Sequence, residues 1–107
     1  MKDFFFIRHN AKIYRIPFND VLFIESLRNY CRIHTKDSTL LTLKSMKELE
    51  ASLPEDDFIR IHKSYIVAVN KISQLTKTEV CLDKRQCFPV GETFRTRLQS
   101  FVGGRLL

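Results

Sequence analysis

Three short segments of this sequence are rich in side chains that donate hydrogen bonds. Their members are Arg28 and Asn29; His62, Lys63 and Ser64; and Thr93, Arg95 and Arg97. Such groups donate to phosphate oxygens, and the planar groups of Arg and Asn also match the edges of guanine and adenine. Lys44 stands just before a predicted helix, whose N-terminal amides also favour a phosphate. The chemistry that these residues indicate is nucleic-acid binding.

Catalytic and metal-binding chemistry has little support in the residue pattern. Cys31, Cys81 and Cys87 lie in apolar or alternating stretches without C-x-x-C spacing, so we expect buried, reduced thiols. The three histidines are scattered and supply neither paired zinc ligands nor a local Cys–His signature. The three glycines form no phosphate-binding loop. We therefore expect no enzyme activity, no cofactor and no metal.

The formal charge of +6 is unevenly distributed. Residues 45–57 contain five acids and one lysine, a net charge of −4, which defines an acidic segment. The rest of the chain has 17 basic residues against seven acids, a net of +10. A charge run is usually a solvated face. Here, however, many bases lie at predicted turns, which favours a polyanionic partner.

Length and composition are those of an ordinary globular domain. The chain has 107 residues, 44% hydrophobic and 28% charged, and we expect one domain over residues 1–107. The longest apolar runs are too short to cross a bilayer, and the N-terminus lacks the apolar region of a signal peptide. These features predict a cytoplasmic protein without membrane association.

The elements that must position these side chains are mostly strands. Short apolar or alternating runs recur at hairpin-like spacing, separated by polar turns, which is typical of an antiparallel β sandwich. The predicted strands are Phe4–Arg8, Lys12–Phe18, Val21–Leu27, Tyr30–Thr35, Leu40–Leu43, Phe58–Ile61, Tyr65–Val69, Ile72–Thr76, Val80–Leu82 and Cys87–Val90.

Two short helices are predicted between the strands. Ser45 and Glu48 form a capping box that opens the first, and Pro54 ends it. The second begins near Glu92, places Phe94, Leu98, Phe101 and Val102 on one face, and closes at Gly103. Because one helix is acidic and the other has a strong apolar face, loops would have to read the nucleic acid. A compact chain of this length is about 34 Å across, roughly one turn of duplex, so one edge can reach two successive major grooves.

Five blocks of the sequence, in order and in register over about residues 12–102, resemble the LytTR DNA-binding domain family. The most distinctive is FIRIHKSYIV at 58–67, followed by Asn70, which is similar to the family's F-x-R-x-H-[KR]-S-[FY]-[IL]-V-N. The other blocks are residues 16–26, 29–35, 43–53 and 88–91. Many members carry Arg or Ser where this chain has Glu92 and Thr93.

This resemblance implies a mainly β fold, an elongated arrangement of antiparallel sheets with two short helices. It also implies the output domain of a bacterial two-component response regulator, with a receiver domain upstream in a longer chain and a sensor kinase. Such domains regulate transcription by inserting loops into the major groove of double-stranded DNA, usually as two protomers on direct repeats. Arg28 and Asn29 would then contact one major groove, His62, Lys63 and Ser64 mainly the backbone between, and Thr93 with Arg95 the second groove.

The alternative from the residues is a β-rich module for single-stranded nucleic acid or RNA. That class exposes aromatic side chains for base stacking. Here the phenylalanines, including Phe4 and Phe6, lie on apolar runs or faces that we expect to be buried in the core. Plainer interpretations also stay open for single residues: Arg60 and His62 as a structural pair, and Arg28 and Asn29 as an ordinary turn.

Overall fold

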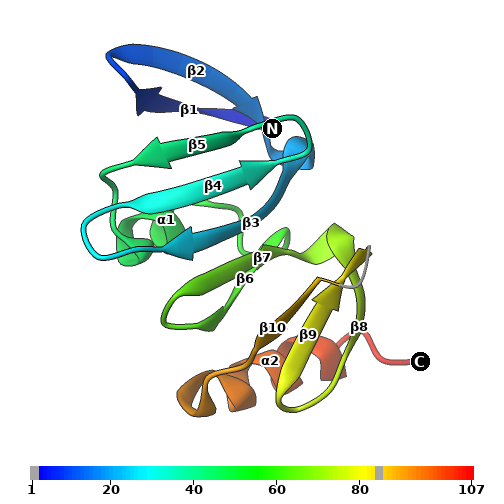
Figure 1. Ribbon diagram of the computed structural model, residues 1–107. Helices are drawn as coiled ribbons and strands as arrows, with labels where there is room; N and C mark the ends of the chain where they lie inside the picture. The colour runs from blue at the N-terminus through cyan, green and yellow to red at the C-terminus, as the bar shows by residue number, and fades with distance from the viewer. Residues whose placement is uncertain (1–2, 84–85) are drawn as a thin grey trace.

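The computed structural model describes residues 3–83 and 86–107, and within them the chain is mainly β-structure (Figure 1). The strands lie within one residue of the predicted bounds at each end. They are β1 (Phe4–His9), β2 (Lys12–Pro17), β3 (Val21–Ser26), β4 (Cys31–Thr35), β5 (Thr39–Thr42), β6 (Phe58–His62), β7 (Tyr65–Ala68), β8 (Ile72–Leu75), β9 (Glu79–Leu82) and β10 (Cys87–Pro89).

The strands pair into three antiparallel sheets. The first is the β1-β2 hairpin, the second has the order β5-β4-β3-β7-β6, and the third has the order β10-β9-β8. The hairpin lies at one end, the five-stranded sheet in the middle and the three-stranded sheet at the other end (Figure 1). The described residues span 43 × 31 × 26 Å, so the predicted elongated arrangement is confirmed.

Two hydrophobic clusters occupy opposite faces of the five-stranded sheet. Consecutive side chains of a strand point to opposite faces. On β7, Ile66 belongs to the cluster with α1 and the β1-β2 hairpin, whereas the neighbouring Val67 belongs to the cluster with α2 and the three-stranded sheet. Both side chains are almost fully buried. The central strands β3 and β7 therefore read as largely continuous apolar runs, because both of their faces are covered.

The first helix, α1 (Met46–Ser52), begins with the predicted capping box. The Ser45 hydroxyl accepts a hydrogen bond from the Glu48 amide, and the Glu48 carboxylate accepts one from the Ser45 amide, each at 3.1 Å. The bond from the Ser45 amide is the main cause that lowers the pKa of Glu48. Because that pKa is depressed, the carboxylate's contribution to stability is present above its unfolded pKa and is lost as pH falls through the folded one.

Removing the Ser45 cap is expected to weaken the fold measurably. Ser45→Ala deletes the side-chain acceptor of one helix amide, so the free energy of unfolding should fall by about 1 kcal/mol. Urea titration followed by circular dichroism measures this change. Ser45→Asp keeps an acceptor at the same position and should stay near the wild-type stability. Equal losses in both variants would show that the hydroxyl cap is not what stabilises this end of α1.

The second helix begins with a 3-10 turn, η4 (Glu92–Phe94), and continues as α2 (Arg95–Gly103). It buries Leu98 completely against the three-stranded sheet and β6. The predicted end at Gly103 is one residue early, because Gly103 is still helical and the Gly104 amide caps the Ser100 carbonyl. Within the described residues, neither α-helix has the length and apolar character that crossing a membrane requires.

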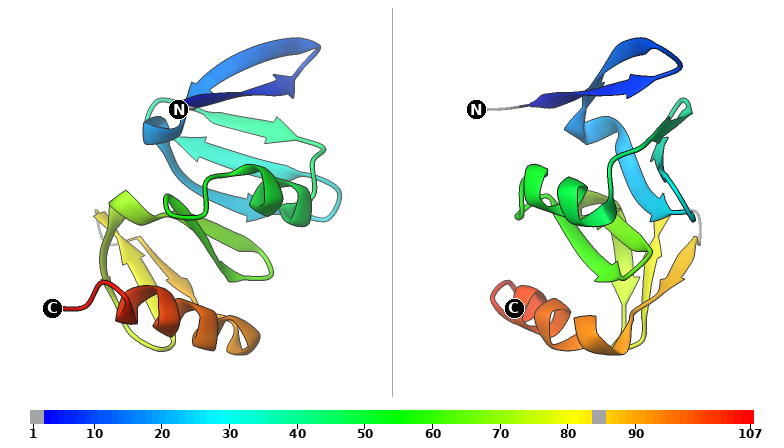
Figure 2. Two further views of the ribbon diagram at one scale, coloured as in Figure 1. Left: turned by 180° about the vertical axis from the view of Figure 1, so that it is seen from behind. Right: turned by 90° about the vertical axis from the view of Figure 1, so that its left-hand side faces the viewer.

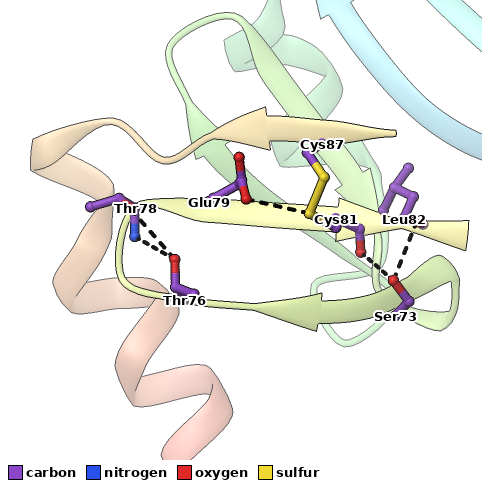
Figure 3. The surroundings of a disulfide bond; sticks show 7 residues. All are labelled: Ser73, Thr76, Thr78, Glu79, Cys81, Leu82 and Cys87. Carbon is purple, nitrogen blue, oxygen red and sulfur yellow. Dashed lines mark hydrogen bonds between the residues drawn. A yellow bond between two sulfur atoms is a disulfide. The ribbon is translucent and has the colours of Figure 1, made fainter. Parts of the chain in front are cut away.

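The prediction of three reduced cysteines is wrong for two of them. Cys81 and Cys87 lie directly opposite each other on β9 and β10 and form a disulfide (Figure 3). Cys81 is buried and Cys87 is exposed, whereas Cys31 is buried and free, as predicted, and burial raises its pKa. A separation of six residues does not show the register of the hairpin, and the register is what places the two sulfur atoms together.

A second expectation that fails concerns the N-terminal phenylalanines. Phe4 and Phe6 lie on the face of β1 opposite to that of the buried Ile7, and they are 39% and 61% exposed. Only one face of this two-stranded sheet packs on the core, so only part of the apolar run at residues 4–7 can be buried. Phe23, Phe58 and Phe88 are buried, whereas Phe5, Phe94 and Phe101 are half-buried.

Candidate nucleic-acid interface

Three connections of the fold follow one another along one long edge of the molecule. They are the β3-β4 turn, the β6-β7 turn and the segment that opens α2 (Figures 1 and 2). These connections carry all the site residues predicted from the sequence except Lys44, which precedes α1. The fold therefore places separate parts of the sequence on one edge, as a duplex-binding surface requires.

The first two turns and Lys44 surround a shared depression. Its lining includes the predicted residues Arg28, Asn29, Lys44 and Lys63. The amide of Ser26, at the end of β3, donates to the carbonyl of Ser64 at 2.9 Å and so ties the two turns together. Arg28, Asn29, Lys44 and Lys63 are all exposed. Four donor side chains from three parts of the sequence thus gather at one place, which favours an anionic ligand.

The β6-β7 turn is held by its own side chains. The His62 Nδ1 atom accepts a hydrogen bond from the Ser64 amide at 3.0 Å. In the neutral imidazole this acceptor role puts the proton on Nε2, which can then donate outward. The Lys63 carbonyl accepts from the Arg60 guanidinium at 2.8 Å, while the Lys63 side chain points to solvent. Side chains of β6 therefore hold the backbone of the turn through two hydrogen bonds, and the turn carries an accessible ammonium group.

The segment that opens α2 forms a separate group of donors. None of Thr93, Arg95 and Arg97 lines the depression around Lys63. Thr93 is exposed, and Arg95 is half-buried with an Nε atom that has no partner among the described residues. The Arg97 guanidinium lies 2.9 Å from the Glu50 carboxylate and remains 53% exposed. Of the three, Arg97 is the one most engaged in contacts within the protein.

A close approach of backbones fixes this segment beside the β6-β7 turn. The Gly91 amide donates to the Ile61 carbonyl of β6 at 2.8 Å. A Cβ atom at Gly91 would lie 3.1 Å from the Phe94 ring and 3.5 Å from the His62 ring. A side chain at this position would therefore crowd the Phe94 ring, which would have to shift by a few tenths of an ångström, whereas its contact with the His62 ring would be an ordinary one.

The acidic segment is largely neutralised by bases from other elements. Glu48 lies 3.6 Å from Lys44, Glu50 contacts bases of β6 and α2, and Asp56 lies 3.2 Å from Arg105. The Lys44–Glu48 pair is well exposed, and such pairs contribute little free energy. Lys44 can therefore exchange its carboxylate partner for a phosphate at small cost.

Sequence reasoning missed two bases that line the depression. Lys47 lies in the first turn of α1, three residues after Lys44, and is exposed. Its place within the acidic segment obscured it, although i,i+3 spacing puts it next to Lys44. The sequence indicates Arg60 only as a structural partner of His62. Its guanidinium contacts the carbonyls of the β6-β7 turn, which its position inside a strand did not indicate.

The fold and the site define the class of this chain. It is an elongated, antiparallel β domain with donor-rich turns along one edge. The family model of the LytTr DNA-binding domain matches residues 11–103. The chain belongs to the LytTr DNA-binding domain family. The resemblance noted from the five sequence blocks is thereby confirmed.

Similar proteins come from several bacteria. The CO-responsive transcriptional regulator RcoM of Rhodospirillum rubrum is 31% identical over 88 residues, which are 77% of this chain and 37% of the relative. The transcriptional regulatory protein NatR of Bacillus subtilis is 24% identical over 70 residues, 65% of this chain and 30% of the relative. This chain thus spans about a third of the length of these curated relatives.

A solved structure with the same fold is the LytTr DNA-binding domain of a Bacillus cereus protein described as a methyl-accepting/DNA response regulator. It superposes with a TM-score of 0.82 and 25% sequence identity. The superposition covers 96% of this chain and 99% of the solved one.

Proposed function

We propose that this chain binds double-stranded DNA in a sequence-specific manner and thereby regulates transcription. The observation that carries this proposal is the convergence of Arg28, Asn29, Lys44 and Lys63 around one depression on a donor-rich edge. Membership of the LytTr DNA-binding domain family supports it, as does the naming of two relatives as transcriptional regulators.

Base reading and backbone positioning are assigned to different residues. Arg28 and Asn29 carry planar groups with several donors on an exposed turn, so they read base edges in one major groove. Lys44, Lys63, Ser64 and the Nε2–H of His62 contact the phosphate backbone. Thr93, Arg95 and Arg97 meet the second groove, where Glu92 accepts from a cytosine amino group or limits the approach of phosphate.

The dimensions of the domain suit two successive major grooves. Its longest extent is 43 Å, and one turn of duplex is about 34–36 Å. Because the β3-β4 turn and the segment that opens α2 lie at successive positions along one edge, each can enter its own groove while the β6-β7 turn lies over the backbone between them.

The proposal also covers the longer protein in which this chain would be one domain. We place the chain as the output domain of a two-component response regulator in the cytoplasm, with a receiver domain upstream and a sensor kinase as partner. Two protomers would occupy direct repeats on one duplex. The family and the description of both relatives as transcriptional regulators support this setting, and the matched segment makes up only 37% and 30% of these relatives, which leaves room for a further domain.

A second candidate function has one observation in its favour. Phe4 and Phe6 are exposed on the outer face of the β1-β2 hairpin, beside Arg15, and exposed aromatic residues next to bases can stack on single-stranded nucleic acid. This face lies at the far end of the molecule from α2, whereas the donor-rich edge follows the turns (Figure 1). Duplex DNA therefore remains the first candidate.

Competition between duplex and single strand separates the two functions. A labelled duplex pool bound to the domain is challenged with unlabelled duplex, single-stranded DNA and RNA of the same sequence. We expect duplex to compete best, and Phe6→Ser to leave duplex binding unchanged. Preferential competition by single strands, abolished in Phe6→Ser, would replace the duplex proposal with the second candidate.

Lys63→Ala is expected to weaken binding without relaxing sequence preference. The Lys63 ammonium is a point charge on a flexible stem, which suits a phosphate better than a base edge. Affinity for preferred and scrambled duplexes should fall by a similar factor, and the slope of log K against log salt should flatten by about 0.9. Fluorescence anisotropy at several salt concentrations measures both. Loss of preference with an unchanged slope would assign Lys63 to base reading instead.

A further inference from the structure

The Arg60 side chain joins the β6-β7 turn to α1. Its guanidinium donates to the Lys63 carbonyl at 2.8 Å, to the His62 carbonyl at 3.3 Å and to the Glu50 carboxylate at 3.3 Å. The side chain is only 18% exposed, so most of it is removed from solvent. A planar guanidinium can satisfy several acceptors at fixed angles, which makes Arg60 suited to holding a turn in one conformation.

Glu50 extends this connection to α2. Its second carboxylate oxygen lies 2.9 Å from the Arg97 guanidinium. The Arg60 and Arg97 guanidinium carbons lie 5.4 Å and 5.3 Å from the centre of the Phe94 ring, within cation–π range. One carboxylate on α1 thus links a base of β6 to a base of α2, and both bases contact the residue that precedes α2.

We propose that Glu50 and Arg60 are positioning residues that fix the β6-β7 turn and the segment that opens α2 as one rigid unit. This inference rests on the proposed function, in which these two segments contact one duplex. If their relative position is set before binding, less conformational freedom is lost on the DNA. An acidic residue then increases affinity for the preferred site, although its own charge repels phosphate.

A positioning role and simple electrostatics predict opposite changes in DNA affinity when the Glu50 charge is removed. Removing a negative charge should tighten binding to any DNA if charge alone matters. Removing the Glu50 charge should weaken binding to the preferred duplex if positioning matters. Because Arg60 and Arg97 would both lose their shared partner, the loss should be about tenfold, the size expected for charged hydrogen bonds.

The experiment compares Glu50→Gln with Glu55→Gln. Glu55 is exposed and lines the same hollow as Glu50 and Arg60, which is separate from the depression around Lys63. It has no ion pair among the described residues, so its substitution changes the charge equally without breaking the network. Each variant is titrated against a duplex enriched by the wild-type domain from a random pool and against a scrambled duplex. We expect Glu50→Gln to lose about tenfold on the enriched duplex only, and Glu55→Gln to bind both as tightly as wild type or more tightly.

Two results would overturn the inference. In the first, Glu50→Gln binds both duplexes more tightly, as Glu55→Gln does. In the second, Glu50→Gln loses affinity for both duplexes in proportion to a loss of folded protein in urea titration, which is a purely structural role. A wild-type domain with no preference for any duplex would instead refute the proposed function, so the two failures are distinguishable.

Arg60→Lys supplies an independent readout. Lysine keeps the charge but cannot reach three acceptors in one plane, so affinity for the enriched duplex should fall while the salt slope stays at the wild-type value. In Arg60→Gln, which removes the charge, the slope should also stay at the wild-type value; a slope flattened by about 0.9 would mean that Arg60 itself contacts a phosphate, which contradicts a positioning role. Should Arg60→Lys fail to fold, Glu50→Gln, with a carboxamide of nearly the same shape, decides the question alone.

Discussion

A fourfold rise in salt concentration is expected to lower the affinity of this domain for duplex DNA by about 10²–10³-fold. Outside the acidic segment the sequence carries a net charge of +10, and the acids of that segment are mostly paired with bases of the protein. With about five phosphates neutralised per protomer, release of counterions gives a slope of roughly −4 to −5.

The salt titration has a clear contrary result. Anisotropy measured from low to moderate salt, with protein concentration fixed, yields the slope directly. Lys63→Ala and Lys44→Ala should each flatten the slope by about 0.9, while Lys77→Ala, on the exposed β8-β9 turn, should leave it unchanged. A nearly flat titration of the wild type would mean that the basic surface is merely solvated.

Alanine substitution of Arg28 or Asn29 is expected to act on preference rather than on general affinity. Each bidentate contact with a base edge contributes about 1–3 kcal/mol of discrimination, so each variant should lose about 5- to 150-fold on the preferred duplex and much less on a scrambled one. Both residues are exposed, and the turn's backbone bond from the Leu27 amide to the Tyr30 carbonyl needs neither side chain. Folding should therefore be unaffected.

The control for these variants is Lys63→Ala, which should lower the affinity for both duplexes by a similar factor. Titrations of each variant against two duplexes at two salt concentrations separate reading from positioning. If Asn29→Ala and Arg28→Ala lower all affinities equally while Lys63→Ala erases sequence preference, the two roles are reversed.

The strands and the first helix were predictable because their signals are local. Alternation of apolar residues, polar turns and the Ser45–Glu48 capping box act within a few residues, and the structure follows them closely. The family was predictable from five blocks held in register. The division into three sheets was not, because it depends on which strands pair across the chain, and periodicity does not encode that choice.

Long-range placement explains what the sequence could not reveal about the site. The disulfide of Cys81 depends on hairpin register, and the exposure of Phe6 depends on which face of a two-stranded sheet lacks a partner. The link from Glu50 to Arg60 and Arg97 joins residues up to 47 positions apart in the numbering. Sequence patterns marked the donors at the turns, whereas the contacts that hold those turns appear only in the fold.

Selection of bound duplexes from a random pool tests the central claim most directly. The wild-type domain is incubated with random duplex DNA, and bound molecules are recovered, amplified and sequenced over several rounds. Two blocks of enriched base pairs about one helical turn apart are expected, because two segments on one edge read successive major grooves. Arg28→Ala and Asn29→Ala should blur one block and leave the other. A pool that stays random in sequence through all rounds, although DNA is retained, would contradict sequence-specific recognition by these loops.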